Sequence, residues 1–525
     1  MTDTPTATLG ELPELAAQRH GDTPFLCDLP WTAYGREVRD IAGFASAVHD
    51  YADRFWAAGI RANDVVAVVQ RNHIEVQALA YGLSRIGALP ILLSFGIEPT
   101  EILECLAKLD RPYVVIDDAG ARRLGEHRQA LSGLGKSLLH LTPAGERTED
   151  APDTSWLAPT GDRSAHQAQP RGHDEWAVVT HTSGTTSVPK LAVQSGRTLY
   201  SLIATQIATA RSFGEVALSA KHLSFVHART CSVVLGFLEV AMPMLWIADP
   251  SPERTTSVML KHRPDSIETH PNIFIQWEPV AAHPERPFGA VQRYVSTFDA
   301  IHPRTIRALF DGSDRPDAYY IQAYGQTETG AVTARLIRRD EAATYRPRDV
   351  GRCIPHAALR VVDAAGEPVP PGQSGFIESK TPGRFVGYIG SLSAADPIAA
   401  PNPTNLEWWP MGDIGREAPD GSLELLDRIV DHAEGTDSFL AIEDVLLDRL
   451  PELVEMVLLR SVGDQKVVAV ASPRDGVEFD PARFHEAAAS FDLRGIPLHV
   501  LPWRTLPLTG SYKVRRGVLR ARLES

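Results

Sequence analysis

Short apolar runs alternate with amphipathic segments between residues 64 and 116, and this alternation restricts the possible folds of the chain more than any other feature. Apolar runs at 65–69, 89–93 and 112–116 have the length of buried strands, and the first is rich in β-branched side chains. Between the first two runs, apolar residues share one face of a predicted helix that ends at Gly87. A second helix is predicted to begin at Pro99. Strands separated in this way by helices form a largely parallel sheet, so an α/β fold is expected.

The chain of 525 residues is long enough for more than one domain. Two stretches without a periodic pattern, at 142–174 and 391–405, are rich in turn-forming and small residues, and the first is expected to run over the surface between subdomains. The segment from 431 to 525 carries its own signals, with predicted helices at 442–450 and 481–489 and predicted strands at 454–459 and 466–471. We therefore expect a small C-terminal unit after a much larger N-terminal part.

The composition excludes several classes of protein. Apolar residues make up 43% of the chain and charged residues 22%, which is typical of soluble globular proteins. The formal net charge of −14 argues against a nucleic-acid-binding surface along the whole chain but allows a local anion site. The sequence predicts neither a membrane span nor a signal peptide. The four cysteines are scattered, so a reducing cytoplasm is the expected compartment.

The strongest local signal is a hydroxyl-rich run around one glycine, THTSGTTSVPK at 180–190, which follows an apolar strand-like segment. Gly184 lets the backbone turn its N–H groups toward one point, the hydroxyls add donors, and Lys190 adds a positive charge. These features are typical of a phosphate cradle, although the glycine spacing is not that of the Walker motif. The alternative is a polar turn between two strands.

Three further segments combine polar residues that would suit a nucleotide. In the run YGQTETG, the Tyr324 ring can stack on a base, Thr327 can donate to a phosphate, and Glu328 can hold Mg²⁺. Asp413 follows a glycine and can accept from both ribose hydroxyls. Lys513 lies in a turn near the C-terminus and can be presented to a distant site. The alternatives are an ordinary polar loop, a common turn dipeptide and a basic tail, respectively.

Taken in order, these segments resemble the motifs of the adenylate-forming superfamily, which includes acyl-CoA synthetases, adenylation domains of nonribosomal peptide synthetases, and luciferases. YGQTETG matches the adenine and magnesium motif of that family without a change. THTSGTTSVPK, MGDIGREAPDGSLELLDR and PLTGSYKVRR are similar to its phosphate loop, its ribose motif and its C-terminal lysine motif. The resemblance covers nearly the whole chain. It implies a large N-terminal domain of βαβ subdomains, 1–428, and a small, mobile α+β C-terminal domain, 429–525.

The resemblance also implies a reaction. Members of the family join ATP and a carboxylic acid into an acyl-adenylate with release of pyrophosphate, and then pass the acyl group to a thiol. The expected ligands are therefore ATP, Mg²⁺ and a small carboxylic acid, with coenzyme A or the phosphopantetheine of a separate acyl carrier protein as the acceptor. No nucleic acid partner is expected. The sequence leaves the identity of the acid open.

Residues at matching positions receive expected roles from the resemblance. Tyr324 would stack on adenine, Thr327 would contact the α-phosphate, and Glu328 would bind Mg²⁺. The phosphate loop would contact the departing phosphates through Thr182, Ser183, Gly184, Thr185, Thr186 and Lys190.

The remaining expected roles concern the ribose and the acid. Asp413 and Arg428 would hold the ribose, and Lys513 would bridge the carboxylate and the α-phosphate. His227 would gate the acyl pocket. Arg229, two residues beyond this gate, would either pair with a second acidic group on the substrate or face solvent, and exposure to solvent is the expectation. No enzyme nucleophile is needed, because the substrate carboxylate itself attacks.

The sequence departs from the family pattern at several positions. Ser187 and Leu191 stand where glycines are usual in the phosphate loop, and Tyr512 replaces the glycine before the C-terminal lysine. Val430 occupies a hinge position that usually carries Asp or Lys, and the loop that follows it, to residue 441, is short. In the family this loop lines the acceptor tunnel, so the adenylation half-reaction is better supported than transfer to a thiol.

Three functions are compatible with these patterns. The first is an acid:thiol ligase that forms an acyl-adenylate. The second, motivated by the irregular loop at 430–441, is a ligase whose adenylate is captured by an amine or another nucleophile. The third is a nucleotide-binding sensor without catalysis, and the joint retention of Lys190, Glu328, Asp413 and Lys513 argues against it.

Overall fold

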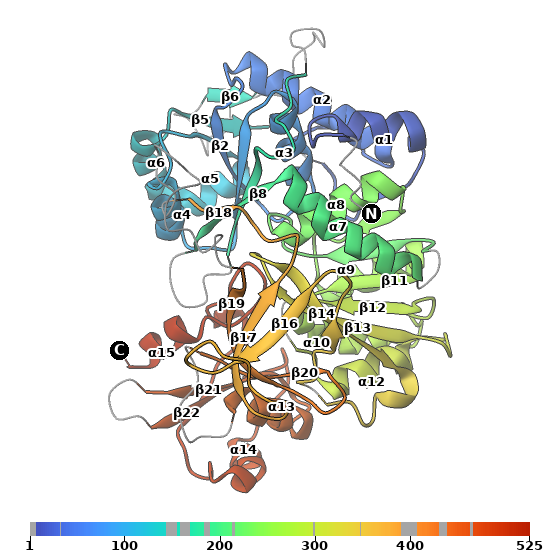
Figure 1. Ribbon diagram of the computed structural model, residues 1–525, viewed down its shortest axis with the longest axis vertical. Helices are drawn as coiled ribbons and strands as arrows, with labels where there is room; N and C mark the ends of the chain where they lie inside the picture. Colours follow the sequence, from blue (N-terminus) through green and yellow to red (C-terminus); the bar gives the residue numbers. More distant parts are fainter. Residues whose placement is uncertain are drawn as a thin grey trace.

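Two large sheets and two smaller ones build the chain (Figure 1). The computed structural model describes residues 7–31, 33–142, 155–157, 168–182, 189–212, 216–297, 300–346, 348–389, 407–429, 438–461 and 466–524. The α-helices of these residues are α1 (Leu12–His20), α2 (Ile41–Ala57), α3 (Glu75–Arg85), α4 (Pro99–Leu106), α5 (Asp118–Leu124), α6 (Arg128–Leu134), α7 (Gly196–Ser212), α8 (Ala228–Val240), α9 (Pro252–His262), α10 (Pro271–Gln276), α11 (Glu278–Ala281), α12 (Pro303–Gly312), α13 (Phe439–Arg449), α14 (Pro481–Ala488) and α15 (Arg516–Glu524).

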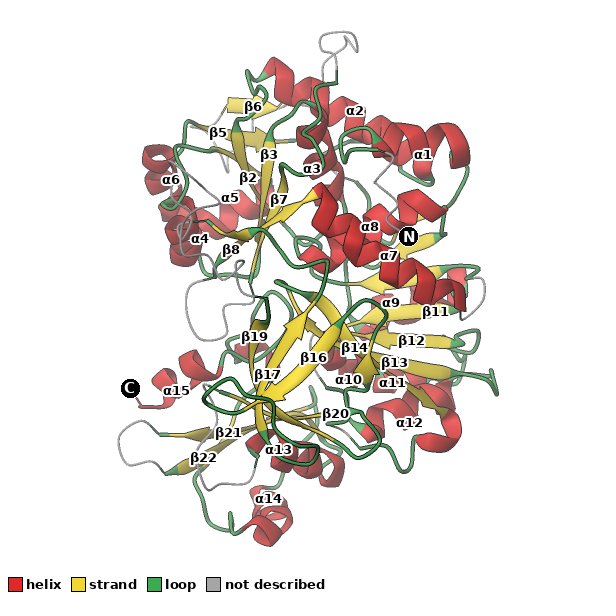
Figure 2. Cartoon of the chain, viewed as in Figure 1, coloured by secondary structure: helices red, strands yellow, loops and turns green. Residues whose placement is uncertain are grey.

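The first sheet has helices on both faces (Figure 2). Alternate residues of β2 point to opposite faces: Val66 and Val68 pack in a core with α2 and α3, whereas Ala67 and Val69 pack in a core with α4 and α5. Burial on both faces explains the continuous apolar runs in the sequence, and the predicted α/β fold is confirmed. In spatial order the strands are β18 (Gly387–Tyr388), β8 (Leu191–Ser195), β7 (Trp176–His181), β3 (Leu89–Ser94), β2 (Val65–Gln70), β4 (Tyr113–Ile116), β5 (Ser137–Leu141) and β6 (Ser155–Leu157).

The second sheet has two faces of different character. Ala220, Ile267, Tyr294 and Tyr320 point to one face and pack in a core with side chains of α9 to α12. The opposite face points toward α8 and lines the cavity described below. In spatial order the strands are β1 (Phe25–Cys27), β10 (Met244–Trp246), β9 (Ser219–His222), β11 (Ser266–Thr269), β12 (Arg293–Ser296), β13 (Tyr319–Gln326), β14 (Gly330–Arg338) and β15 (Arg352–Cys353).

The C-terminal unit is the red region at the bottom of Figure 1, next to an antiparallel sheet that closes the N-terminal part. That antiparallel sheet consists of β16 (Ala358–Val362), β17 (Gly375–Lys380), β19 (Trp409–Glu417) and β20 (Leu423–Arg428). The C-terminal unit contains β21 (Leu453–Arg460), β22 (Val467–Pro473) and β23 (Leu498–Val500), covered by α13 to α15. Of these elements, α13, α14, β21 and β22 match the helices and strands predicted after residue 431, whereas β23 and α15 were not predicted. The domain boundary at 428/429 stays a prediction, because residues 430–437 lie outside the described part of the chain.

The segment at 142–174 contains one element that was not predicted. Residues 155–157 form β6, which pairs in parallel with β5 and buries Leu157. Most of the remaining segment, and the whole of 391–405, lie outside the described residues. None of the helices that the structure describes is both long enough and apolar enough to cross a membrane.

Candidate active site

One cavity of about 780 Å³ lies between the N-terminal sheets and the C-terminal unit, and its volume is typical of small-molecule sites. The predicted residues that the structure describes all line it: Thr182, Lys190, His227, Tyr324, Thr327, Glu328, Asp413, Arg428 and Lys513. The other predicted residues, Ser183, Gly184, Thr185 and Thr186, lie outside the described residues. The fold therefore gathers four motifs that are far apart in the sequence around one space.

Thr182 and Lys190 flank the phosphate-loop segment at the ends of β7 and β8. The two strands are antiparallel neighbours. The Thr182 N–H donates to the Lys190 carbonyl at 2.9 Å, and the Lys190 N–H donates to Thr182 Oγ1 at 3.1 Å. These bonds hold the two ends of the segment together. Leu191, which stands in place of a usual glycine, is the first residue of β8, and its side chain is fully buried in the core.

Glu328 is buried beside an aromatic ring that also contacts Lys190. The Tyr388 hydroxyl donates to Glu328 Oε1 at 2.5 Å, and Lys190 Nζ lies 5.0 Å from the centroid of the Tyr388 ring. Burial raises the pKa of the Glu328 carboxyl, although the Tyr388 hydroxyl and the charge of Lys190 act in the opposite direction. Over the described ranges, no three His, Cys, Asp or Glu side chains are grouped so that they could hold a metal ion by themselves.

Thr327 and His227 form a hydrogen-bonded pair on the cavity wall. His227 caps the N-terminus of α8, where its Nδ1 accepts from the Arg229 N–H at 3.1 Å. This bond assigns the ring proton to Nε2, which lies 3.0 Å from Thr327 Oγ1 and donates to it. Burial, with the nearby charges of His181 and Lys513, lowers the pKa of His227 to about 3, so the ring is neutral at pH 7. Because Thr327 Oγ1 accepts the proton of His227 Nε2, the Thr327 hydroxyl donates its own proton to an acceptor other than His227.

Tyr324, Asp413 and Arg428 are linked across two sheets. The Tyr324 hydroxyl donates to Asp413 Oδ2 at 2.7 Å. Asp413 and Arg428 are opposite each other in the antiparallel pair β19 and β20, and Arg428 Nε lies 3.9 Å from Asp413 Oδ1. Tyr324 does not lie in a polar loop, which was the alternative for this segment, because β13 continues to Gln326 with a bulge after Tyr324. An aromatic ring and a carboxylate thus lie together, as a base and its ribose would require.

Replacing Asp413 by alanine should raise the KM for ATP about 10- to 100-fold. If Asp413 accepts from a ribose hydroxyl, as the resemblance implies, the variant loses a charge-assisted hydrogen bond worth roughly 1.5–3 kcal/mol. Tyr324→Phe removes only the hydroxyl that donates to Asp413, so this control should change the KM much less. Steady-state kinetics at varied ATP measures both variants. A normal KM in Asp413→Ala would leave Asp413 with a structural role in β19 only.

Lys513 reaches the cavity from the C-terminal unit on a short turn. The Thr509 N–H donates to the Lys513 carbonyl at 2.8 Å, and the Lys513 N–H donates to Thr509 Oγ1 at 3.1 Å. Gly510, in the same turn, lies against the large domain, and a Cβ on Gly510 would come within 2.6 Å of Ser94 Oγ. A side chain at this position would therefore push the turn away. The alternative of a free basic tail does not fit this placement.

Tyr512, the residue in place of the usual glycine, inserts between two buried histidines of the large domain. Its backbone is left-handed, with φ of 60°. Its ring centroid lies 5.6 Å from that of His222 and 5.3 Å from that of His270, and its hydroxyl lies 3.2 Å from His222 Nε2. Asn272 Nδ2 donates to the Tyr512 carbonyl at 2.9 Å. A glycine would make none of the side-chain contacts, so Tyr512 fastens the Lys513 turn to the large domain.

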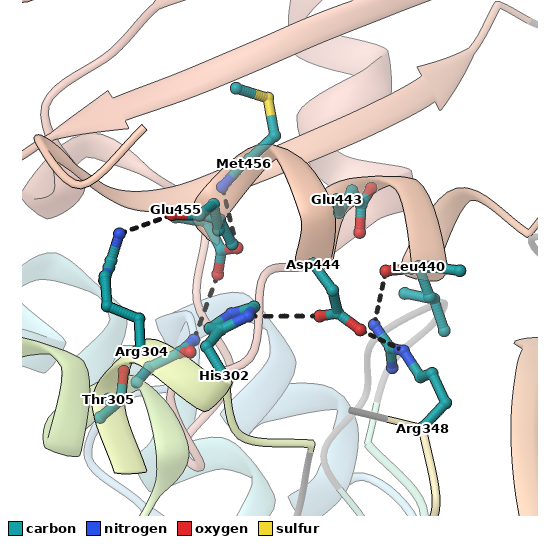
Figure 3. Close-up of polar contacts among 12 residues, drawn as sticks. His302, Arg304, Thr305, Arg348, Leu440, Glu443, Asp444, Glu455 and Met456 are labelled. Carbon is teal, nitrogen blue, oxygen red and sulfur yellow. Dashed lines mark hydrogen bonds and ion pairs between the residues drawn. The ribbon is translucent and has the colours of Figure 1, made fainter. Parts of the chain in front are cut away.

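Polar contacts join α13 of the C-terminal unit to the large domain beside the cavity (Figure 3). Asp444 lies between a histidine and an arginine: its Oδ1 is 3.4 Å from His302 Nδ1, and its Oδ2 is 2.6 Å from Arg348 Nε. Arg348 also donates to the Leu440 carbonyl at 2.8 Å. Further ion pairs across the same interface are Arg474–Glu278 and Arg515–Glu101. The C-terminal unit is thus docked in the arrangement that directs Lys513 into the cavity.

Sequence reasoning missed a charged cluster on the cavity wall. Lys221 Nζ donates to Glu268 Oε2 at 2.6 Å, and Arg229 Nε donates to Glu268 Oε1 at 2.7 Å. The expectation that Arg229 faces solvent is wrong, because its side chain is only 19% exposed and is held by Glu268. A signal was present in the sequence: Lys221 and Glu268 are single charges within short strand-forming runs, next to Ala220 and Ile267 of the apolar face.

The chain matches known proteins over most of its length. Residues 14–389 match the family model described as AMP-binding enzyme. The chain is 32% identical to 3-amino-2-hydroxy-4-methoxybenzoate diazotase of Streptomyces cremeus over 97% of this chain and 94% of that protein. It is 26% identical to a feruloyl-CoA synthase of Amycolatopsis over 97% of this chain and 96% of that protein. The fold is similar to a solved benzoate CoA ligase from Burkholderia xenovorans, with a TM-score of 0.77, 17% identity, and coverage of 98% of this chain and 100% of that one.

Proposed function

The chain belongs to the AMP-binding enzyme family, and we propose that it uses ATP to activate a small carboxylic acid as an acyl-adenylate, with release of pyrophosphate. The observation that supports this most is the single cavity shared by residues of the large domain and by Lys513 of the C-terminal unit. The substrate carboxylate is itself the nucleophile toward the α-phosphorus. The protein therefore has to position two reactants and stabilise the charge that moves between them.

Thr327 and Lys513 are the proposed partners of the α-phosphate. Because His227 Nε2 donates to Thr327 Oγ1, the Thr327 hydroxyl can donate its own proton to a phosphate oxygen. The Lys513 ammonium would contact both the carboxylate and the α-phosphate while negative charge passes to the pyrophosphate. A neutral His227 can orient Thr327 without repelling Lys513, which is the consequence of its low pKa of about 3, caused mainly by burial.

Glu328 is the proposed protein ligand for Mg²⁺. It is a buried carboxylate in the wall of the cavity, with one hydroxyl partner, and Mg²⁺ is commonly held by one or two carboxylates together with water and substrate phosphates. The residues present therefore fit the metal. When bound, Mg²⁺ neutralises charge on the triphosphate. Lys190, whose Nζ lies 5.0 Å from the centroid of the Tyr388 ring, would add a second positive charge to the same phosphates.

A thiol is the proposed acceptor in the second half-reaction, either coenzyme A or the phosphopantetheine of a separate acyl carrier protein. The similarity to a protein named feruloyl-CoA synthase supports this acceptor. The loop at 430–437, which would line the acceptor tunnel, lies outside the described residues. If the C-terminal unit moves for the transfer, the contacts of Tyr512 with His222 and of Asp444 with Arg348 have to break first.

A second candidate function is the diazotisation of an aryl amine, favoured by the higher identity to a protein named as a diazotase. In that reaction a nitrite oxygen would displace pyrophosphate from ATP and form a mixed anhydride of nitrous acid and AMP. The amine nitrogen would attack the nitroso nitrogen, AMP would leave with the N–O bond cleaved, and the amine would lose a proton. Loss of hydroxide from the tautomer would then give the diazonium ion. The amine takes the place of the thiol as the acceptor.

Release of pyrophosphate from ATP tests both candidates. Purified protein is mixed with ATP, Mg²⁺ and either a set of aryl and fatty acids, or nitrite together with 3-aminobenzoate. Acid-dependent release, followed by a thioester when coenzyme A is added, supports the first function. Release that requires nitrite, with a diazonium product trapped by azo coupling, supports the second. If no acid and no nitrite mixture releases pyrophosphate, both proposals fail.

A further inference from the structure

The wall of the cavity that faces α8 carries polar and charged side chains where an apolar acid would need apolar ones. Alternate residues of β9, β11 and β12 point to this wall: Ser219, Lys221, Ser266, Glu268, Arg293 and Val295. Lys221 and Glu268 are direct partners in the register of β9 and β11. Arg229 approaches them from the first turn of α8, two residues after His227.

The cluster of Lys221, Glu268 and Arg229 is buried. The exposed fractions of the three side chains are 9%, 1% and 19%, respectively. Burial alone would raise the pKa of Glu268, but the adjacent Arg229 and Lys221 hold it at about 2, so the carboxylate is ionised. A buried charged triad is weak support for stability, because removing the charges from water offsets most of their mutual attraction. Its position in a cavity wall suggests a role toward a ligand instead.

The cluster has more donors than acceptors. Lys221 has three N–H donors and Arg229 has five, and each residue uses one on Glu268. Within the described ranges, neither side chain makes another hydrogen bond. Burial, with the nearby charges of Arg229 and Arg293, lowers the pKa of Lys221, but these two arginines alone outnumber the one carboxylate, so the wall carries net positive charge. Such a wall attracts an anionic oxygen from a ligand and repels a cation.

We propose that Lys221 and Arg229 bind an anionic oxygen, a carboxylate or a phenolate, carried by an aromatic substrate in addition to its reacting group. This rests on the proposed function, because the reacting group is placed at Thr327 and Lys513. Apolar side chains from α8 and from the sheet line the same cavity and favour a flat ring: Val233 and Phe237 on α8, and Val295 and Ile321 on the sheet. The two cations set which acids, or which amines, enter the site.

Equilibrium binding to the full chain in the presence of AMP tests this without any turnover. Titration calorimetry compares benzoate with isophthalate, and aniline with 3-aminobenzoate, because each pair differs by one carboxylate. A third comparison, benzoate with 3-hydroxybenzoate, separates a phenol site from a carboxylate site. We expect the added oxygen to lower Kd about tenfold or more in at least one pair. Equal Kd values within all three pairs would overturn the proposal.

Variants assign the preference to the cluster. Lys221→Met should remove most of the gain in affinity, whereas Lys261→Met, the same change at an exposed position on α9, should keep it. Arg229→Gln retains the Lys221–Glu268 pair. It replaces Lys221→Met in the binding experiment if Lys221→Met melts far below the wild type. A preference that persists in both cluster variants would also overturn the proposal.

The two proposals fail in different ways. If the proposed function is wrong, pyrophosphate is not released with any acid or with nitrite, while the binding preference for the extra oxygen can still be measured. If the role of Lys221 and Arg229 is wrong, turnover is found but benzoate and its substituted forms bind and react equally well.

Discussion

Replacement of Lys513 by alanine is expected to lower the rate of adenylate formation about 100- to 1,000-fold, the usual cost of removing one donor that acts on transition-state charge. Lys513 lines the same cavity as Thr327 and Glu328, and its charge acts on the buried His227. No other lysine of the C-terminal unit lines this cavity among the residues that the structure describes. The half-reaction is measured as pyrophosphate release in a single turnover.

The second half-reaction gives the control for this variant. Transfer from an acyl-adenylate that is supplied ready-made should be nearly normal in Lys513→Ala, because the lysine acts only while the α-phosphate is attacked. Lys261→Ala, on the exposed face of α9, should leave both half-reactions unchanged. Equal losses in both half-reactions would point to a structural defect. Normal adenylate formation would remove Lys513 from the catalytic site.

The sheets of the N-terminal part could be predicted because their signals are local. Strands β2 and β3 are buried on both faces, so their apolar runs are continuous and short. β6 could not be predicted, because three residues in an aperiodic segment have no pattern of their own. Their strand conformation depends on hydrogen bonds from β5, which is a tertiary contact.

In the candidate site, too, some residues could be predicted from local sequence and others could not. Thr327, Glu328 and Lys190 belong to contiguous motifs whose residue types state their chemistry. Lys221 and Glu268 could not be paired from the sequence, since only the register of β9 against β11 places them opposite each other. Tyr512 was visible as a departure from the family pattern. Its function as a contact between two domains depends on His222 and His270, which come from distant strands and loops.

Glu328→Gln is expected to reduce turnover at saturating ATP about 100-fold or more and to raise the Mg²⁺ concentration required, because an amide is a much poorer ligand for Mg²⁺ than a carboxylate. The amide keeps the size of the side chain and can still accept from the Tyr388 hydroxyl. Turnover is measured as pyrophosphate release over a Mg²⁺ titration. Glu253→Gln, at an exposed position on α9, is the matched control and should behave like the wild type.

Glu328→Gln should keep or raise the stability of the fold, although it lowers activity. Burial raises the pKa of Glu328 in the folded chain above the value of 4.5 for an unperturbed glutamate. A group with a raised folded pKa stabilises the fold fully below its unfolded pKa and loses that contribution as the pH rises through the folded pKa. At pH 7, above the unfolded pKa, Glu328 therefore costs stability in the ligand-free protein, and the neutral amide removes this cost. The variant should melt at the same or a higher temperature than the wild type. A lower melting temperature together with lost activity would make Glu328 a structural residue, and normal Mg²⁺ dependence would exclude it as a metal ligand.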